Sequence, residues 1–290
     1  MYISYSGYKT FNDCPLEYWH KYVGKTRPPK PDNRVNALYG TVVGKIFERF
    51  YNDFIWKRAD RARQELLASV YPTIEEIVAE ESKKGIYAWS DSKSNYPCVE
   101  AVAEDVRIAV RNGLEIIKMY RLLGPKAEAE VKLDFKQGDN IIGGRADFII
   151  QRCDPHNDLT LLDGKGSKHR EKYVDGAQLR WYALLYLLNY GKTPDKLGFV
   201  YWRSPPSDAL DFVDFTVPGL RMLETQILKT MATIAEGIRV LEGRAPVEGR
   251  GPFQPLPEPS RCRFCTYRPL CQKKIMSAPP IGVEDVSLES

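Results

Sequence analysis

The hydrophobic pattern of this 290-residue chain changes its period near residue 126, and this change limits the folds that the chain can adopt. Before that point, apolar residues recur every three or four positions, which is typical of helices that bury one face. The predicted helices of this part cover about residues 37–59, 62–84, as one helix or a pair, and 99–122. Pro15 predicts the start of an earlier short helix, because proline is favoured in a first helical turn. The N-terminal part is therefore predicted to be mainly helical.

After that point, apolar residues alternate with polar ones or form short runs, as they do in strands. The predicted strands cover residues 129–135, 141–150, 159–165, 197–203 and 211–217. A helix over 174–190 is apolar nearly all round and is predicted to be buried, and another helix is predicted at about 219–242. Helices followed by strands with an interposed helix predict an α/β fold, in which a central mixed β-sheet is flanked by helices and preceded by a helical lobe.

The sequence disfavours two classes of protein, secreted proteins and membrane proteins. The N-terminus lacks the apolar run of a secretory signal, and the most apolar helical stretch, 181–190, is about half of what a bilayer span needs. We therefore expect a cytoplasmic protein with no membrane association, whose six cysteines are metal ligands or buried thiols and not disulfides. The formal net charge of +4 permits nucleic-acid binding without arguing for it.

Two aspartates and a lysine stand in neighbouring predicted strands. Asp147 lies in GGRADFII, and Asp163 and Lys165 lie in LTLLDGK. Because strand side chains alternate between faces, Asp163 and Lys165 point the same way. Two carboxylates on adjacent strands can hold Mg²⁺ or Mn²⁺, which can activate water for phosphodiester hydrolysis, and a lysine can orient that water or offset developing charge. The alternative is a set of solvated strand-end charges, since Asp-x-Lys is common by chance.

The order GGRAD, LLDGK and QLRWY resembles the PD-(D/E)XK nucleases of the RecB and AddB type and the CRISPR-associated exonucleases like them. The resemblance implies a restriction-endonuclease-like core with Asp147, Asp163 and Lys165 as catalytic residues. It also makes Gln178 catalytic, as a contact to the lysine or to the DNA near the scissile phosphate; the alternative is a buried amide in the core. Tyr182, four residues later on the same helix face, is predicted to contact DNA.

Three cysteines lie close together near the C-terminal end: Cys262, Cys265 and Cys271. Two cysteines three positions apart readily bind one metal centre, and a closed site needs a fourth ligand. From spacing alone, the candidates for that ligand are Cys14, Cys98 and Cys153, and the metal is zinc or an iron–sulfur cluster.

The segments around these cysteines resemble iron–sulfur nucleases of the same family, which open as SYSGYKTFNDCPLEYW does and end as CRFCTYRPLC does. The resemblance implies that Cys14 joins Cys262, Cys265 and Cys271 around a [4Fe–4S] cluster, with zinc as the alternative. Cys98 and Cys153 have no counterpart, and we interpret them as small core residues.

The chain departs from the family at Gly44, which stands where a metal-binding histidine is usual. Glu48 lies one turn further along the same helix face and can supply a carboxylate to the metal; otherwise it is a solvated residue, or the site is weakened. Glu130 stands on the strand that leads to the metal in the family, either as a further acid of the site or as a solvated strand-edge charge.

A basic loop and two aromatic pairs are candidate DNA contacts. The basic side chains of the loop after the third strand are Lys168, Arg170 and Lys172. They can hold phosphates near the metal. The pairs that can stack on unpaired bases are Tyr18–Trp19 and Tyr201–Trp202, the second together with Arg203. The alternative for both sets is an ordinary surface or core without such a role.

These features predict a metal-dependent DNA exonuclease that acts on single-stranded DNA or DNA ends, with protein partners in recombination, repair or CRISPR adaptation. The alternative is a catalytically degenerate DNA-binding or assembly subunit with a structural iron–sulfur or zinc site. The expected division is an N-terminal cysteine segment, a helical lobe, the nuclease core, a C-terminal cysteine-rich segment and a flexible tail. The corresponding residues are 1–24, 25–125, 126–245, 246–274 and 275–290.

Overall fold

The structure is a computed structural model, and it describes residues 1–28, 32–83, 85–92, 94–151, 158–166, 170, 176–241 and 251–275. The chain divides into two compact units. The first is Met1–Tyr8 with Asp32–Ala235, and the second is Lys9–Pro31 with Glu236–Ser290. None of the helices in the described ranges is both long and apolar enough to cross a membrane.

A mixed sheet forms the centre of the first unit. Its strands among the described residues are β1 (Tyr2–Ser4), β4 (Lys126–Gln137), β5 (Asn140–Gln151), β6 (Leu159–Lys165), β7 (Lys196–Tyr201) and β8 (Leu210–Phe212). The order is β1-β5-β6-β7-β8, with β4 paired to β5. The β1–β5 and β6–β7 pairs are parallel, whereas β4–β5, β5–β6 and β7–β8 are antiparallel. This sheet confirms the predicted α/β class.

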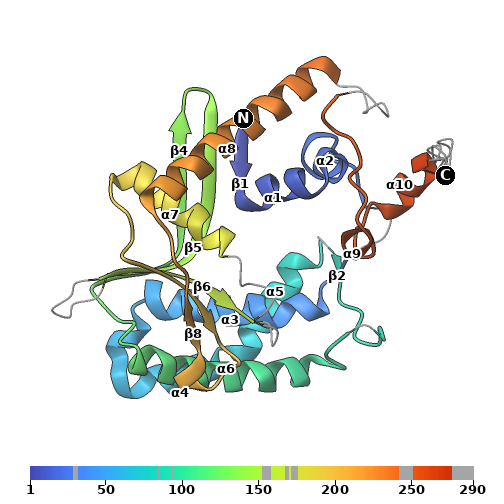
Figure 1. Cartoon of the computed structure of the whole chain (residues 1–290). Coiled ribbons are helices and arrows are strands. Elements are labelled where there is room, and N and C mark those ends of the chain that lie inside the picture. The colour runs from blue at the N-terminus through green and yellow to red at the C-terminus, as the bar shows by residue number, and fades with distance from the viewer. Residues whose placement is uncertain are drawn as a thin grey trace, which may run out of the picture. The chain divides into compact units, whose positions relative to one another are not determined.

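Helices flank this sheet. Those described in the first unit are α3 (Val35–Asn52), η2 (Ile55–Arg58), α4 (Ala59–Ala68), α5 (Val70–Glu81), α6 (Val99–Met119), η4 (Pro206–Asp208), α7 (Ala177–Tyr190) and most of α8 (Val217–Leu241). Figure 1 shows α3 and α6 below β6, and α7 above it. Two short parallel strands, β2 (Asp32–Asn33) and β3 (Gly85–Ile86), lie within the helical part.

Aromatic side chains join α3 to the sheet. Phe47 stacks on Trp202 with ring centroids 4.3 Å apart, and Tyr51 packs on Phe148 at 5.5 Å. Gly113 lets α6 approach this layer, because a Cβ atom there would lie 2.1 Å from the ring of Phe47. The helix that carries Gly44 and Glu48 is therefore fixed against the sheet by a fully packed core.

Two parts of the sheet differ from the sequence prediction. The strand expected over 211–217 was wrong beyond residue 212, since β8 ends at Phe212 and α8 already begins at Val217. Pro218 explains the difference, because proline cannot donate to a strand ladder and is favoured in the first turn of a helix. The strand β1 was not predicted, because three residues of parallel pairing to a distant segment leave no periodic signal in the sequence.

The second unit joins segments from the two ends of the chain. Its described elements are the end of α1 (Tyr5–Asp13), α2 (Pro15–Tyr18), the π-helix η1 (Trp19–Val23), the end of α8, α9 (Pro259–Cys262) and α10 (Arg268–Ile275). The predicted helix start at Pro15 is confirmed. Phe253 packs against Phe11 and Tyr18, and the Arg261 guanidinium lies 3.2 Å from the Asp13 carboxylate.

Candidate active site

The two aspartates meet where β5 and β6 pair. The strands are antiparallel, and Phe148 pairs with Leu162. Asp147, which precedes Phe148, and Asp163, which follows Leu162, therefore occupy neighbouring positions. The backbone N–H of Gly164 donates to Asp147 Oδ2 at 2.7 Å. The ammonium of Lys165 forms an ion pair with Asp163 Oδ2. The strand alternation thus places Asp163 and Lys165 on one face, beside Asp147.

Burial dominates the electrostatics of this pair. Asp163 is 1% exposed, and the side chain of Lys165 is 12% exposed. Burial raises the pKa of Asp147 well above its usual value, the neighbouring Asp163 raises it further, and the N–H of Gly164 offsets part of this. Burial also raises the pKa of Asp163, against the opposing charge of Lys165. Two buried carboxyl groups with one ammonium form a site that is short of positive charge.

Gln178 and Tyr182 continue this set of contacts from α7. Lys165 Nζ donates to Gln178 Oε1 at 3.0 Å, and Gln178 Nε2 donates to the hydroxyl of Tyr182 at 3.0 Å. Tyr182 is only 6% exposed, and its described hydrogen bond is the one from Gln178. Tyr182 is therefore linked to Lys165 through Gln178. A contact of either residue with DNA stays a prediction.

A cleft of about 490 Å³ opens beside Asp147. Gly44 and Glu48 line it from α3, and a Cβ atom on Gly44 would meet nothing within 4 Å. Glu48 forms an ion pair at 3.1 Å with Lys45 of its own helix. The α3 face that the sequence indicated therefore does border the cleft, with open space at Gly44.

Glu130 lines the same cleft from β4, in a backbone conformation that the sequence does not reveal. Its φ angle is +55°, whereas Ala129 and Val131 on either side pair regularly with β5. A left-handed backbone at a non-glycine residue inside a strand is strained, and such strain gathers at functional sites. Burial raises the pKa of Glu130, and Arg145 lies 3.6 Å from its carboxylate. Sequence reasoning identified this acid but gave Arg145 no role.

No ready-made cage for a metal ion occurs in the described ranges. Within them, no group of three or more His, Cys, Asp or Glu side chains is arranged so that it could hold a metal ion. Asp147, Glu48 and Glu130 line one cleft, and Asp163 is buried beside Asp147, without forming such a group.

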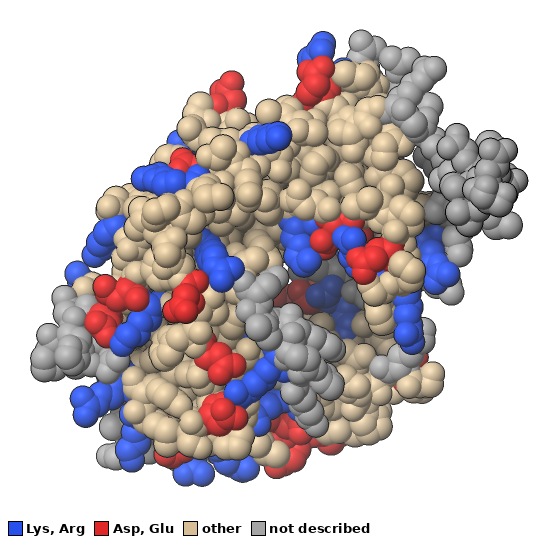
Figure 2. Space-filling model, in the orientation of Figure 1, with Lys and Arg blue, Asp and Glu red and all other residues tan. Residues whose placement is uncertain are grey.

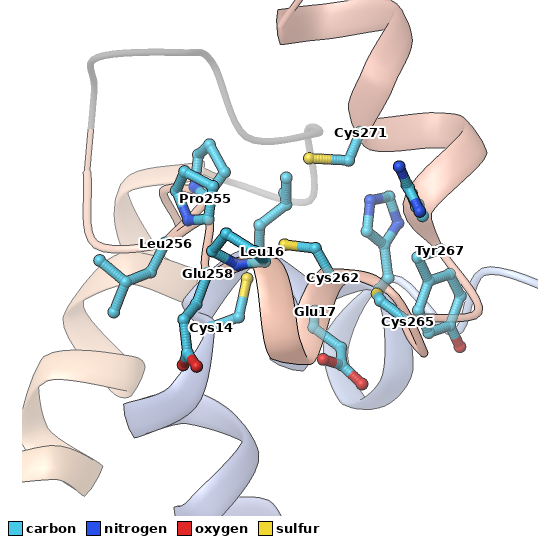
Figure 3. Close-up of a pocket in the computed structure, with 14 residues that line it drawn as sticks. Cys14, Leu16, Glu17, Pro255, Leu256, Glu258, Cys262, Cys265, Tyr267 and Cys271 are labelled. Carbon is cyan, nitrogen blue, oxygen red and sulfur yellow. The ribbon is translucent and has the colours of Figure 1, made fainter.

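The four predicted cluster cysteines line one pocket of about 300 Å³ in the second unit: Cys14, Cys262, Cys265 and Cys271. All four are free thiols and half-buried. Figure 3 shows the sulfur of Cys271, on α10, pointing into the pocket that Cys14 and Cys262 also border. Cys98 lies elsewhere, at the N-cap of α6, and is half-buried, so it is not the core residue that we expected. Cys153 lies outside the described residues.

The outcome differs between the predicted aromatic and basic contacts to DNA. Tyr201 and Trp202 are 2% and 3% exposed, so the prediction that they stack on bases was wrong. Arg170 is held within the protein: its guanidinium donates to Ser204 Oγ at 2.7 Å and lies 4.6 Å from the ring centre of Tyr201. Lys168 and Lys172 lie outside the described residues.

The remaining aromatic pair and the charge on the face drawn in Figure 2 do not form a broad DNA platform among the described residues. Tyr18 is buried against Phe253, and Trp19 is half-buried. Figure 2 shows Lys and Arg side chains interspersed with Asp and Glu on the face that it draws. On that face, phosphate contacts would therefore have to be local.

The model of the PD-(D/E)XK nuclease superfamily matches residues 2–272. A solved structure of a “Putative exonuclease” from Eubacterium rectale is similar, with a TM-score of 0.50 and 14% identity over 100% of this chain and 94% of that chain. At this identity the likeness concerns the fold alone. The structure of SSO0001 has a TM-score of 0.27 and 18% identity, covering 68% of this chain and 78% of that chain, which is too low a score to bear on the fold. No curated protein matches the chain by sequence.

The family match runs from β1 to α10, and within it the two aspartates and the lysine of the motif stand together at one buried place. The chain belongs to the PD-(D/E)XK nuclease superfamily.

Proposed function

We propose that this protein is a divalent-metal-dependent DNA nuclease whose active site is formed by Asp147, Asp163 and Lys165. The observation that carries the proposal is the contact set of Lys165, whose ammonium pairs with Asp163 and donates to Gln178 at 3.0 Å. Two carboxyl groups buried beside one ammonium cost stability, because desolvation of charge is incompletely compensated. Such a costly arrangement is expected where chemistry requires it.

The chemistry of these donors fits Mg²⁺ or Mn²⁺. Asp147 and Asp163 would hold the ion, because carboxylate oxygens are the ligands that both metals prefer. Glu48 and Glu130, which line the adjacent cleft, are the further ligands that we propose from its walls. When bound, the metal would polarise a phosphodiester oxygen and lower the pKa of a water molecule.

Lys165 would orient the attacking water or offset the charge that develops on the phosphate. Gln178 holds the lysine for this task, because its side-chain oxygen accepts from Nζ while its amide nitrogen donates to Tyr182 at 3.0 Å. The hydroxyl of Tyr182 has a raised pKa through burial and stays protonated at neutral pH. Its tasks are therefore to accept from Gln178 and to fix the amide orientation.

An end of a DNA strand, in single-stranded or frayed form, is the substrate that we propose. Carboxylates from α5 line one wall of the cleft: Glu76, Glu80 and Glu81. Glu76 pairs with Arg49 and Glu81 pairs with Arg34, so Glu80 is the carboxylate of this wall that would repel the phosphates of a strand continuing past the site. An end of a strand needs a path on only one side of the site. The printed name of the Eubacterium rectale structure, “Putative exonuclease”, agrees with action at an end and says nothing of the kind of strand.

The cysteine pocket would hold a [4Fe–4S] cluster that joins the two ends of the chain. Support comes from the donor set: Cys14 and the three C-terminal cysteines border one pocket. Polar contacts already hold these segments together, since the N–H of Leu16 donates to the carbonyl of Gln254 at 3.3 Å. Four thiolates also suit zinc, and metal analysis separates the two.

The rival function is a degenerate subunit that binds DNA without cleaving it. The observation in its favour is Gly44, which lines the cleft without a side chain and leaves open space there. The intact contacts among Asp147, Asp163, Lys165 and Gln178 favour cleavage.

The test is digestion of end-labelled linear and closed circular single strands, and of linear duplex, with Mg²⁺ or Mn²⁺. We expect metal-dependent loss of the linear single strand and survival of the circle. Asp163→Ala should abolish the activity, and Asp134→Ala, an aspartate of β4 paired with Lys132 at 2.7 Å, should not. No cleavage of any substrate with either metal would support the degenerate subunit.

A further inference from the structure

Arg203, which lies shortly after β7, donates hydrogen bonds to three different residues. Its Nε–H donates to the carbonyl of Gly166 at 2.8 Å, and Nη1 donates to Asp105 Oδ2 at 2.7 Å. Nη2 donates to the hydroxyl of Tyr96. The guanidinium also lies 3.6 Å from the centre of the Tyr39 ring. One side chain thus joins β6, α6 and α3.

The carbonyl that Arg203 holds belongs to the strand end that carries the active-site motif. Gly166 directly follows Lys165, and the carbonyl of Lys165 itself accepts from the N–H of Trp202 at 3.3 Å. Residues 202 and 203 therefore fix two successive carbonyls of this strand end. A guanidinium fork suits this task, because its donors have a fixed planar geometry.

The other side of the contact is the cleft face of α3. Tyr39 directly precedes Gly40, and Gly40, Gly44 and Glu48 line the cleft from successive turns. The two elements approach closely here, because a Cβ atom on Gly166 would lie 3.0 Å from the Tyr39 ring and 3.2 Å from Gly40 Cα. The spacing between β6 and α3 is thus set at the point that Arg203 holds.

We infer that Arg203 is a positioning residue, which holds the β6 end with Asp163 and Lys165 at a fixed distance from the α3 face with Glu48. This inference rests on the proposed metal-dependent nuclease. Arg203 lies behind the site, between Gly166, Asp105, Tyr96 and Tyr39, so it acts through the placement of the metal ligands. Loss of such supporting contacts typically lowers metal affinity or activity by about 10- to 100-fold.

The test compares Arg203→Lys with the parent and with Arg107→Lys. Lysine keeps the charge but cannot reach Gly166, Asp105 and Tyr96 together. Arg107 is a matched control on α6, since its guanidinium lies 5.0 Å from the ring centre of Tyr71 on α5 and its side chain is not among those that line the cleft. Binding of Mn²⁺ without DNA is measured by calorimetry, and cleavage of the linear single strand is measured at saturating metal.

We expect Arg203→Lys to weaken Mn²⁺ binding by about 10-fold and to lower kcat by about 10-fold or more, with KM for DNA nearly unchanged. Arg107→Lys should match the parent in both assays. Asp105→Asn, which removes the anionic partner of Arg203, should shift Mn²⁺ binding in the same direction by less. An Arg203→Lys protein that binds Mn²⁺ and cleaves like the parent overturns the inference. Failure of the parent to cleave would instead overturn the proposed function.

Discussion

The aspartate site of the first unit and the cysteine pocket of the second differ in how firmly the protein fixes their side chains. Asp147, Asp163 and Lys165 are tied to the protein by an ion pair and hydrogen bonds, in a place where Asp163 is 1% exposed. The cysteines border their pocket as free, half-buried thiols. The first site is therefore organised by the fold, whereas we propose that the second needs a bound metal centre to bring the sulfurs together.

This difference predicts separable consequences when each site is changed. Removing a group from the first site should abolish chemistry and leave the fold in place, because the surrounding core does not depend on the metal. Removing a group from the second should act mainly on stability, because metal binding and folding are coupled where the ligands are not preorganised.

The largest expected effect is on cleavage by Lys165→Ala. Loss of the ammonium removes the group that orients water or offsets developing charge, and kcat should fall by about 100- to 1000-fold. DNA binding, measured by fluorescence anisotropy without divalent metal, should stay nearly intact. Near-parental cleavage by this variant would show that the active site lies elsewhere.

The cysteine pocket is tested next, by its colour and its thermal stability. Protein purified without oxygen should be brown and contain about four irons per chain, the number in one cubane cluster. Cys14→Ala and Cys265→Ala should lose the iron equally and lower Tm by about 10 °C, since each removes one of four ligands. Cys98→Ala is the matched control, because this thiol lies at the N-cap of α6 and outside the pocket. Stoichiometric zinc without iron would show that the pocket holds zinc and not an iron–sulfur cluster.

The third effect concerns the wall of the cleft. Glu48→Gln should weaken Mn²⁺ binding by about 10-fold, because it removes a negative charge from the cleft that also contains Asp147. Gly44→His should shift the preference towards Mn²⁺, because an imidazole there has open space around its Cβ atom and is a softer ligand. Metal titration of cleavage measures both. A Glu48→Gln protein that titrates like the parent would remove Glu48 from the ligand set, and cleavage that appears only with Gly44→His would favour the degenerate subunit.

Sequence periodicity predicted those parts of the site that follow from local geometry. Alternation along β6 put Asp163 and Lys165 on one face, and helical spacing put Gln178 and Tyr182 together, which their 3.0 Å hydrogen bond confirms. The same reasoning failed for Tyr201 and Trp202. Aromatic residues at a strand end can face solvent or core, and only the packing of Phe47 on Trp202 decides it.

Contacts between distant segments could not be predicted, because they depend on the register of the whole sheet. The left-handed backbone of Glu130 occurs between Ala129 and Val131, which pair with β5, and no residue type in β4 signals it. Arg203 likewise follows an ordinary strand, and its partners Asp105 and Tyr96 come from 98 and 107 residues away in sequence.

The smallest expected effect is a gain in stability from Asp147→Asn. Burial raises the pKa of Asp147 well above its usual value, so the folded state keeps its proton where the unfolded state has lost it. As pH rises from about 4, the usual range of an unfolded aspartate, the unfolded state binds fewer protons and stability falls, until the pH passes the raised pKa. Metal-free protein should therefore lose stability across this window, and the asparagine variant should lose less.

At pH 7 without metal, Asp147→Asn should be more stable by about 1 kcal/mol, or about 2–4 °C in Tm, although it cannot cleave DNA. The asparagine oxygen can still accept from the N–H of Gly164, so the change isolates the charge. Mn²⁺ should reverse the order, because it stabilises the parent by binding the ionised pair and has little affinity for the variant. Thermal unfolding of the parent and the variant at pH 5 and pH 7, with and without Mn²⁺, measures these differences. A variant that is less stable than the metal-free parent at pH 7 would mean that the ionised Asp147 is already compensated within the protein, and the site would then need no metal to offset its charge.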